Sequence, residues 1–276
     1  MSAAILAPVN APFGDPVPSV HLAEAPLGLV VVQARFPTVM TLDLDTGREL
    51  VAKFQESIRR DYPLMSEARE LGIALSGPGF EPTTTSGLIF RFASPDHAWQ
   101  VSLSRSFVAL HTNTYTERAD LLSRLQKVLA ALSAAIQPGL CERLGVRYSA
   151  RLTDPVILAR LPELIRPEIL ATDAVPGILE SGVRRVHLTT DAMYELPDSS
   201  LRARWGILPP GSTIDPNLAP ASGESFFIDI DVLSATVDDF DPLALIERIR
   251  AFSDHQYRYF RWMVTPEFLQ AHGAHQ

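Results

Sequence analysis

The sequence predicts an α+β fold, in which a curved, mainly antiparallel sheet carries long helices on one face, as in helix-grip or saddle-like folds. Two observations predict it. Both halves of the chain read in one order: a strand, a helix, three or four antiparallel strands and a long helix. Most connections between strands are also too short for the crossovers of a doubly wound parallel sheet. The matched order further predicts an internal duplication into two halves, residues 26–138 and 139–276, that form one compact unit.

A flexible N-terminal arm, residues 1–25, is expected before the first half. It holds four prolines and shows no sustained periodicity, which is typical of a mobile segment. The alternative is a segment that lies over the body of the protein through Phe13 and Val20.

The first half is expected to begin with a strand at residues 27–36, where apolar residues alternate. Thr46 would cap the next helix, with Glu49 completing a capping box, and the residue before Pro63 would end it. Further strands are expected at residues 71–75, 87–93, 99–103 and 107–115. A long helix that is capped by Thr116 and extends to about Ile136 closes this half, because its leucines and valines form one broad stripe.

The second half is expected to repeat that order. Its first strand, residues 139–153, is followed by a helix that starts at Asp154 and Pro155 and is interrupted near Pro162 and Pro167. Further strands are expected at residues 183–196, 201–208 and 224–234. A helix at residues 241–263 closes the chain, with a proline at its first position.

The strand at residues 139–153 has two unlike faces, because side chains alternate along a strand. One face is apolar. The other carries three arginines, Arg143, Arg147 and Arg151. They require water, carboxylates or an anionic partner, and the guanidinium fork suits carboxylate and phosphate groups. Pairing with neighbouring Asp and Glu side chains is the alternative interpretation.

Two carboxylates, Asp229 and Asp231, share one face of the strand at residues 224–234. At this spacing they can bind one divalent metal or raise each other's pKa. The alternative is that they pair with the arginines of a neighbouring strand. We expect this strand to lie beside the first strand of its own half, with the three arginines opposite Asp229, Asp231 and Glu224.

Other strands carry further candidate residues. Arg185 and His187 share a face of the strand expected at residues 183–196, and Arg202 and Arg204 share a face of the strand expected at residues 201–208.

His111 and Tyr115 share a strand face and could act in acid–base chemistry, although a polar strand end before a helix is the alternative. The single cysteine, Cys141, excludes an internal disulfide and is expected in the core. The chain has no P-loop, GxGxxG, GxSxG, HExxH or paired CxxC motif. No cofactor is therefore expected.

Composition narrows the class of protein. The hydrophobic fraction of 46% and the charged fraction of 20% are ordinary for a globular protein. A net charge of −8 disfavours nucleic-acid binding through bulk charge. No apolar run reaches spanning length, and the first residues do not form a Lys/Arg-led signal sequence. We expect a cytoplasmic protein that does not bind membranes, with a homo-oligomer left open.

Four segments resemble a sporadically distributed bacterial protein family of about this length that has no assigned function. They are APLGLVVVQARF from residue 25, RLGVRYSARL from residue 143, FFIDIDVL from residue 226 and VTPEF from residue 264. The resemblance covers about residues 25–269. In that family an Asn tends to stand two residues after the Arg-Tyr pair, where this chain has Ala150. The resemblance therefore implies a fold-sized unit and assigns no chemistry.

These patterns favour a non-enzymatic binding or interaction protein, but they do not decide whether the chain is an enzyme. Its Arg-rich sheet face, or a groove between the halves, would hold a partner protein or a small anionic ligand. The alternative is an enzyme of an unmarked class that uses Asp229, Asp231 and a divalent metal on a phosphate-containing substrate. A nucleic-acid-binding saddle is a third hypothesis, and it would need Phe107 and Phe227 on an open face.

Overall fold

The computed structural model describes residues 7–74, 83–170, 182 and 185–274. Its strands in the first part of the chain are β1 (Leu27–Arg35), β2 (Leu64–Ala74), β3 (Thr83–Ala93), β4 (Trp99–Leu103) and β5 (Phe107–Thr112). Later strands are β6 (Leu140–Cys141), β7 (Arg143–Leu152), β8 (Leu188–Glu195), β9 (Ser199–Leu208), β10 (Ser225–Ser234) and β11 (Asp238–Asp239). These strands and the helices between them make an α+β fold.

The longer helices are α2 (Arg48–Ile58), α3 (Arg118–Ala135) and α7 (Pro242–Met263). Shorter ones are α4 (Pro155–Ala159), α5 (Leu161–Leu164), α6 (Pro167–Leu170) and α8 (Pro266–Ala271), with 3-10 turns η1 (Met40–Asp43) and η2 (Asp45–Gly47). The α4–α6 series confirms that the helix predicted after Asp154 is interrupted, since Pro162 lies in the first turn of α5 and Pro167 begins α6.

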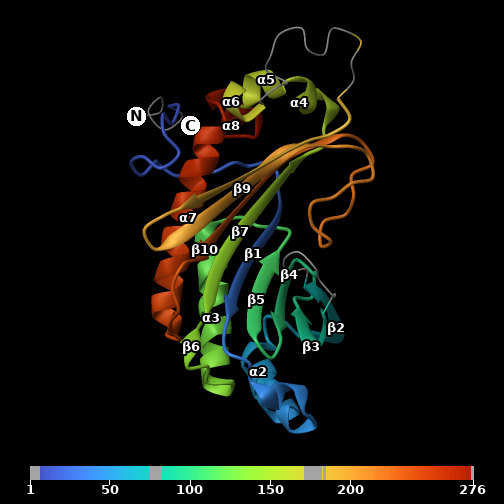
Figure 1. Ribbon diagram of the computed structural model, residues 1–276, viewed down its shortest axis with the longest axis vertical. Coiled ribbons are helices and arrows are strands. Elements are labelled where there is room, and N and C mark those ends of the chain that lie inside the picture. The colour runs from blue at the N-terminus through green and yellow to red at the C-terminus, as the bar shows by residue number, and fades with distance from the viewer. Residues whose placement is uncertain (1–6, 75–82, 171–181, 183–184, 275–276) are drawn as a thin grey trace. The chain divides into compact units, whose positions relative to one another are not determined.

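Nine strands form one mainly antiparallel sheet in the order β2-β3-β4-β5-β1-β7-β10-β9-β8 (Figure 1). A separate pair joins β11 to β6. The predicted α+β class with a large antiparallel sheet is thereby confirmed. The strand predicted at residues 99–103 is β4 with the same bounds, and β1 and β10 fall within one residue of their predictions.

Several predicted boundaries were wrong. β2 begins at Leu64 rather than Leu71, because it pairs with β3 residue by residue along its whole length. β5 ends at Thr112, three residues before Tyr115. The strand predicted from residue 183 begins at Leu188, and residues 183–184 lie outside the described part of the chain.

Neither predicted helix cap forms. α2 starts after Gly47, and no side chain caps it, so the capping box of Thr46 and Glu49 is absent. The 3-10 turn η2 leads directly into α2, with Gly47 already in the helical region, and this geometry leaves no extended residue for a cap. Likewise Glu117, not Thr116, precedes α3, again without a side-chain cap.

The chain divides into two compact units. The first unit comprises Met1–Val30, Arg147–Leu233 and Ala251–Gln276, and the second comprises Val31–Val146 and Ser234–Arg250. The predicted boundaries of the arm and the two halves stay predictions.

The core of the second unit is aromatic and aliphatic. α2 and α3 present apolar stripes, and Phe54 on α2 meets Phe92 on β3 with ring centroids 5.7 Å apart. Phe36 meets Phe240 at 6.5 Å. Cys141 is 1% exposed, as predicted for a core residue, and burial raises the pKa of its thiol to about 11. This thiol is therefore poorly suited to act as a nucleophile.

In the first unit, helices pack on the strands that carry the candidate site. Trp205 on β9 donates its indole N–H to the carbonyl of Ile169 on α6 at 2.7 Å. Gln256 on α7 donates to the carbonyl of Ile230 on β10 at 2.9 Å. α8, which the sequence did not predict, follows α7 and is capped by Thr265, whose hydroxyl also donates to Glu163 near α5 at 2.8 Å. β10 is therefore buried on both faces from Ser225 to Ile230.

Candidate functional site

β7 and β10 are neighbours in the sheet, as the sequence predicted. The amide of Leu144 donates to the hydroxyl of Ser234 at 2.9 Å, while Ser149, further along β7, donates its hydroxyl to Asp229. Residue numbers thus rise along one strand as they fall along the other. This pairing places the arginine-bearing face of β7 beside the carboxylate of β10.

Asp229 is the centre of a buried ion-pair cluster in the first unit. The Nε of Arg147 donates to its Oδ1 at 2.6 Å, and Ser149 donates to the same oxygen. Arg204 on β9 donates to Oδ2 through Nε at 3.0 Å and Nη2 at 2.5 Å. The Asp229 side chain is only 2% exposed. Two guanidinium groups and one hydroxyl therefore occupy both oxygens of this carboxylate.

A second carboxylate reaches Arg147 from the loop between β9 and β10, residues 209–224. Asp215 Oδ2 accepts from Nη1 of Arg147 at 2.5 Å, and its Oδ1 accepts from the backbone amide of Asn217 at 2.8 Å. Burial alone would raise the pKa of Asp215, but the Asn217 amide and Arg147 outweigh it and hold that pKa below its ordinary value. Asp215 therefore stays ionised and fastens the loop to β7.

Arg147 is held between these two carboxylates. Burial opposes the charged form, but the nearby charge of Asp229, its hydrogen bond and Asp215 together raise the pKa of the Arg147 guanidinium. Its Nη2 is nevertheless buried without an acceptor among the described residues. An unpaired buried donor of this kind is costly in a folded protein, so an acceptor bound at this nitrogen would be favourable.

Arg151 is in a different situation. Its Nη1 donates to the carbonyl of Ala219 and its Nη2 to the carbonyl of Ser212, both at 2.6 Å. Its Nε and Nη2 also lie 3.3 and 3.4 Å from the hydroxyl of Ser225. All of these acceptors are neutral. Desolvation by burial lowers the pKa of Arg151, with no carboxylate to offset it. Arg151 thus keeps an uncompensated positive charge within the described part of the chain.

The other ion pairs predicted between the arginines of β7 and the carboxylates on β10 or just before it do not form among the described residues. Arg143 is exposed and makes no ion pair with any described residue. Glu224 pairs with Arg185 at 3.3 Å and not with an arginine of β7. Asp231 is half-buried, and its charge contributes to the raised pKa of Arg202. The strand pairing was therefore predicted correctly, while only Arg147 and Asp229 form the expected contact.

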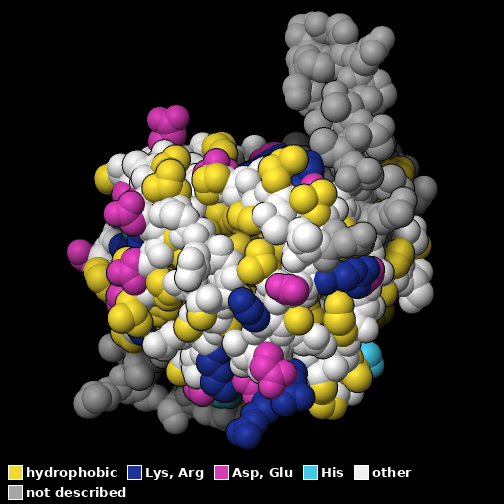
Figure 2. All heavy atoms as spheres, turned by 90° about the horizontal axis from the view of Figure 1, so that it is seen from below, with side chains coloured by type: hydrophobic (Ala, Val, Ile, Leu, Met, Phe, Trp, Pro, Cys, Tyr) yellow, Lys and Arg dark blue, Asp and Glu magenta, His cyan; other side chains and the backbone are white. Residues whose placement is uncertain are grey.

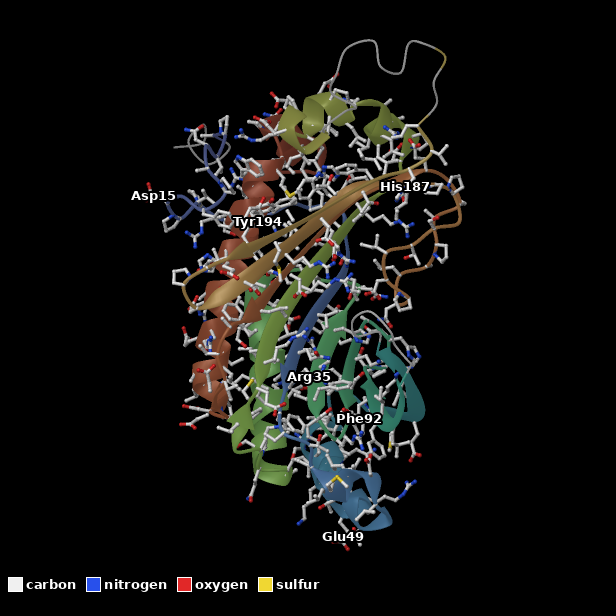
Figure 3. The ribbon with its side chains drawn as sticks, in the orientation of Figure 1. Asp15, Arg35, Glu49, Phe92, His187 and Tyr194 are labelled. Atoms are coloured by element: carbon white, nitrogen blue, oxygen red, sulfur yellow. The ribbon has the colours of Figure 1, made fainter. Side chains whose placement is uncertain are left out.

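Two further predicted groupings do not form on their strands. Tyr115 lies beyond the end of β5, so it does not share a strand face with His111, which sits opposite Gln100 of β4. Both residues belong to the second unit, whereas the arginine cluster belongs to the first. Arg185 and His187, expected on one strand face, precede β8, and His187 contacts Thr189 at 2.7 Å (Figure 3).

The donor set around Asp229 does not favour a metal site. Its two oxygens already accept from positively charged and hydroxyl donors, which a divalent cation would have to displace. Within residues 7–74, 83–170 and 185–274, no group of three or more His, Cys, Asp or Glu side chains could hold a metal ion. The metal-dependent enzyme stays an untested hypothesis without a supporting observation.

The exposure of aromatic, charged and apolar side chains is relevant to two other kinds of partner, nucleic acids and membranes. Phe107 and Phe227, the aromatic side chains that a nucleic-acid saddle would expose, are 8% and 1% exposed and are not available for stacking. On the face shown in Figure 2, the described basic and acidic side chains are interspersed. Among the described residues, no helix is both long enough and apolar enough to cross a membrane.

Sequence reasoning did not assign three residues to the cluster, Ser149, Arg204 and Asp215. Arg204 was recognisable as an outward-facing arginine of β9, but its partner depended on β9 lying beside β10. Asp215 lies in a long loop with no periodicity, and only the folded chain shows that it returns to β7. The Asp215–Asn217 turn gives a weak local signal, because Asp often accepts from the amide two residues on.

Comparison with known proteins adds no relative. No protein-family model, curated protein or solved structure matches the chain significantly. Membership of the bacterial family that the four sequence segments resemble therefore stays a prediction.

Proposed function

We propose that the chain is a non-enzymatic binding protein, in which the Arg-rich face of the first unit binds an anionic group at Arg151. The anionic group is a carboxylate or phosphate, carried by a small ligand or by an acidic side chain of a partner protein. The planar carboxylate and the tetrahedral phosphate both present oxygen atoms that can accept two hydrogen bonds from one guanidinium group.

The observation that carries this proposal is the uncompensated charge of Arg151. Arg147 and Arg204 share the carboxylate of Asp229, and Arg147 also has Asp215. Arg151 has only neutral acceptors from residues 212, 219 and 225. These contacts orient its guanidinium without neutralising it, as expected of a preorganised anion site.

The orphan nitrogen of Arg147 supports the same location. Arg147 and Arg151 lie on one face of β7, and both contact the loop at residues 209–224. An oxyanion beneath this loop would accept from Nη2 of Arg147, which lacks an acceptor among the described residues, and from the remaining N–H of Arg151. Asp215 is an internal anion at the same place and would compete with the ligand.

A calorimetric titration with inorganic phosphate tests the proposal. Arg151→Gln keeps a hydrogen-bond donor but removes the charge, so we expect phosphate affinity to fall by about tenfold or more. Asp215→Asn removes the competing carboxylate, and phosphate should then bind more tightly than to the wild type. A short oligoglutamate peptide in a parallel titration distinguishes an acidic protein segment from a small phosphate ligand.

Arg202→Gln is the matched control. Arg202 pairs with Asp191 through two hydrogen bonds on the exposed part of β9, so its loss should leave phosphate affinity unchanged. Equal affinity in the wild type and in Arg151→Gln would contradict the proposal. So would an equal loss in Arg151→Gln and Arg202→Gln, because that result would indicate general attraction to positive charge.

We also propose that the chain is an internal duplication with a saddle-like sheet and long helices on one face. The strand order supports it, because the first strand of each predicted half pairs with the last long strand of that half, β1 with β5 and β7 with β10. The helices α3 and α7 close the two halves. A circular permutant that begins at residue 139 should fold with the wild-type far-ultraviolet dichroism; a permutant that does not fold would count against two repeated halves.

The proposed location is the cytoplasm. The single cysteine is buried and unpaired, which fits a reducing compartment. Fractionation of cells that express the tagged protein tests this location, and recovery outside the cytoplasmic fraction would contradict it.

A further inference from the structure

The N-terminal arm, residues 7–25, lies along the first-unit part of α7, where Figure 3 labels Asp15 on the arm and Tyr194 on β8. Not one of these residues is buried. The arm is nevertheless fixed at its base, where Leu22 bridges to Ala274 and the amides of Ala23 and Glu24 donate to the chain's last described residues. It therefore resembles a bound peptide more than a core element.

The contacts of the arm are mainly to its backbone carbonyls. Arg261 donates to the carbonyls of Pro18 at 3.1 Å and Ala7 at 3.4 Å. Arg258 donates to the carbonyl of Gly14 at 2.9 Å, and Arg166 donates to that of Val9. Three arginines thus donate hydrogen bonds to backbone carbonyls of the arm.

Tyr257 contacts both an amide and a carbonyl of the arm's backbone. Its hydroxyl accepts from the amide of Val20 at 2.8 Å and donates to the carbonyl of Pro18 at 3.2 Å. Recognition through backbone groups tolerates changes of side chain, provided that the peptide keeps the same backbone path.

One side chain of the arm anchors it. The ring of Phe13 lies 5.1 Å from that of Tyr194 and 5.7 Å from that of Tyr259, measured between centroids. Tyr259 in turn meets Trp262, over which Arg166 is stacked at 5.8 Å. The floor of the groove is therefore aromatic, while Phe13 itself remains 38% exposed.

The chemistry of the arm explains why it suits this groove. Four prolines, at positions 8, 12, 16 and 18, fix their own backbone φ and remove amide donors. Between them the arm turns at residues 11–14, where the amide of Gly14 donates to the carbonyl of Ala11. Such a peptide offers carbonyl acceptors at a low entropic cost of binding. Aromatic grooves with hydrogen-bond donors aimed at carbonyls are the usual receptors for proline-rich segments.

We propose that this groove, formed by Arg166, Tyr194, Tyr257, Arg258, Tyr259 and Arg261, is a docking site for a proline-rich segment with one aromatic residue in a partner protein, and that the arm is its internal competitor. Arg261 is 2% exposed beneath an arm that has no buried residue. Displacing the arm would expose these donors to water, and the carbonyls of another peptide chain could take the place of that water. The exposure of the arm keeps the cost of its displacement low.

A partner protein is a better occupant than the arm of a second copy. The base of the arm is bonded to residues 272–274 of its own chain, which keeps residues 7–20 at a high effective concentration beside their own groove. If two copies exchanged their arms, each arm would make the same contacts that it already makes within its own chain. A partner gains the groove whenever its segment binds more strongly than the arm.

Fluorescence anisotropy with a labelled peptide of residues 7–20 tests the proposal on the full-length chain. Phe13→Ala in the protein weakens the internal arm, so the wild-type peptide should bind that variant about tenfold more tightly than it binds the wild-type protein. Adding Arg258→Gln to Phe13→Ala should reduce binding again, because the carbonyl of Gly14 loses its donor. A peptide with its four prolines replaced by Ala should bind more weakly than the original.

Hydrogen exchange supplies a readout that does not depend on affinity. The Val20 amide should exchange faster in Phe13→Ala and become protected again when the peptide is added. The proposal is overturned if the peptide binds neither protein, or if the proline-free peptide binds equally well. A concentration-dependent dimer of Phe13→Ala that disappears when residues 1–20 are removed would also overturn it, because the groove would then belong to a second copy.

Discussion

At the scale of single residues, Asp229 shows how one buried carboxylate organises the first unit. Two arginines from different strands share it, and its side chain is almost inaccessible to water. A buried ion pair adds little net stability, but removing one partner leaves an uncompensated charge, and that loss is large.

Asp229→Ala should therefore lower the free energy of unfolding by about 3 kcal/mol, as measured by urea denaturation. The double-mutant cycle with Arg147→Ala should show coupling between the two positions. Asp191→Ala is the control, because Asp191 and Arg202 are nearly half exposed and their pair should contribute less than about 1 kcal/mol. Additive effects of Asp229→Ala and Arg147→Ala would mean that the two residues act independently.

Asp215 gives the fold a dependence on pH. Its pKa is below the ordinary value of 3.8, so its ionised form stabilises the folded chain at every pH above that value. This stabilisation is lost as the pH falls below 3.8 towards the pKa of the folded state. Asp215→Asn should accordingly lower the melting temperature at pH 6, and the difference from wild type should shrink below pH 3.8. A difference that stays constant down to pH 2 would show that the Asp215 charge has no role.

At the scale of elements, the pairing of β8 with β9 depends on a glycine. Gly206 has a φ of +150°, and a Cβ at this position would lie 2.0 Å from the carbonyl oxygen of Leu188. That oxygen belongs to the backbone of the neighbouring strand, so it cannot move aside without breaking the pairing.

Gly206→Ala should therefore destabilise the protein by more than about 1 kcal/mol and increase hydrogen exchange along β8. Gly87→Ala on β3 is the matched control, because nothing lies within 4 Å of a Cβ there. Equal melting temperatures for Gly206→Ala and wild type would show that the strands tolerate the added methyl group.

The same scale shows what could be predicted from sequence. Alternation of apolar residues located β1, β4 and β10 closely, because a half-buried strand imposes that pattern itself. The start of β2 could not be predicted, since residues 64–70 take strand structure from pairing with β3 rather than from a pattern of their own. The expected cap at Thr46 failed because the preceding 3-10 turn already sets the backbone. The cap at Thr116 failed because α3 begins one residue later, after Glu117.

The candidate site was predictable to the same extent as its strands. The alternating faces of β7 and β10 indicated that Arg147 and Asp229 could meet, and the order of elements indicated that their strands were neighbours. The role of Asp215 depends on a loop that closes over the sheet from more than sixty residues away in sequence. A contact of that kind leaves no periodic signal.

At the scale of the whole molecule, a net charge of −8 hides a local excess of positive charge. Arg147 and Arg204 pair with Asp215 and Asp229, while Arg151, on the same face of β7 as Arg147, pairs with no carboxylate of the described residues. The excess resides on Arg151, whose described acceptors are all neutral. Bulk charge therefore disfavours anion binding, and the binding that we propose depends on this local site.

The most direct test of that site is an NMR titration of the arginine side chains with inorganic phosphate. The Nε–H resonance of Arg151 should shift and saturate, because it is the arginine of the cluster that lacks a carboxylate. The Nε–H resonance of Arg204 should stay in place, since this arginine is bonded to Asp229 through both Nε and Nη2. An unmoved Arg151 resonance at saturating phosphate would contradict the account.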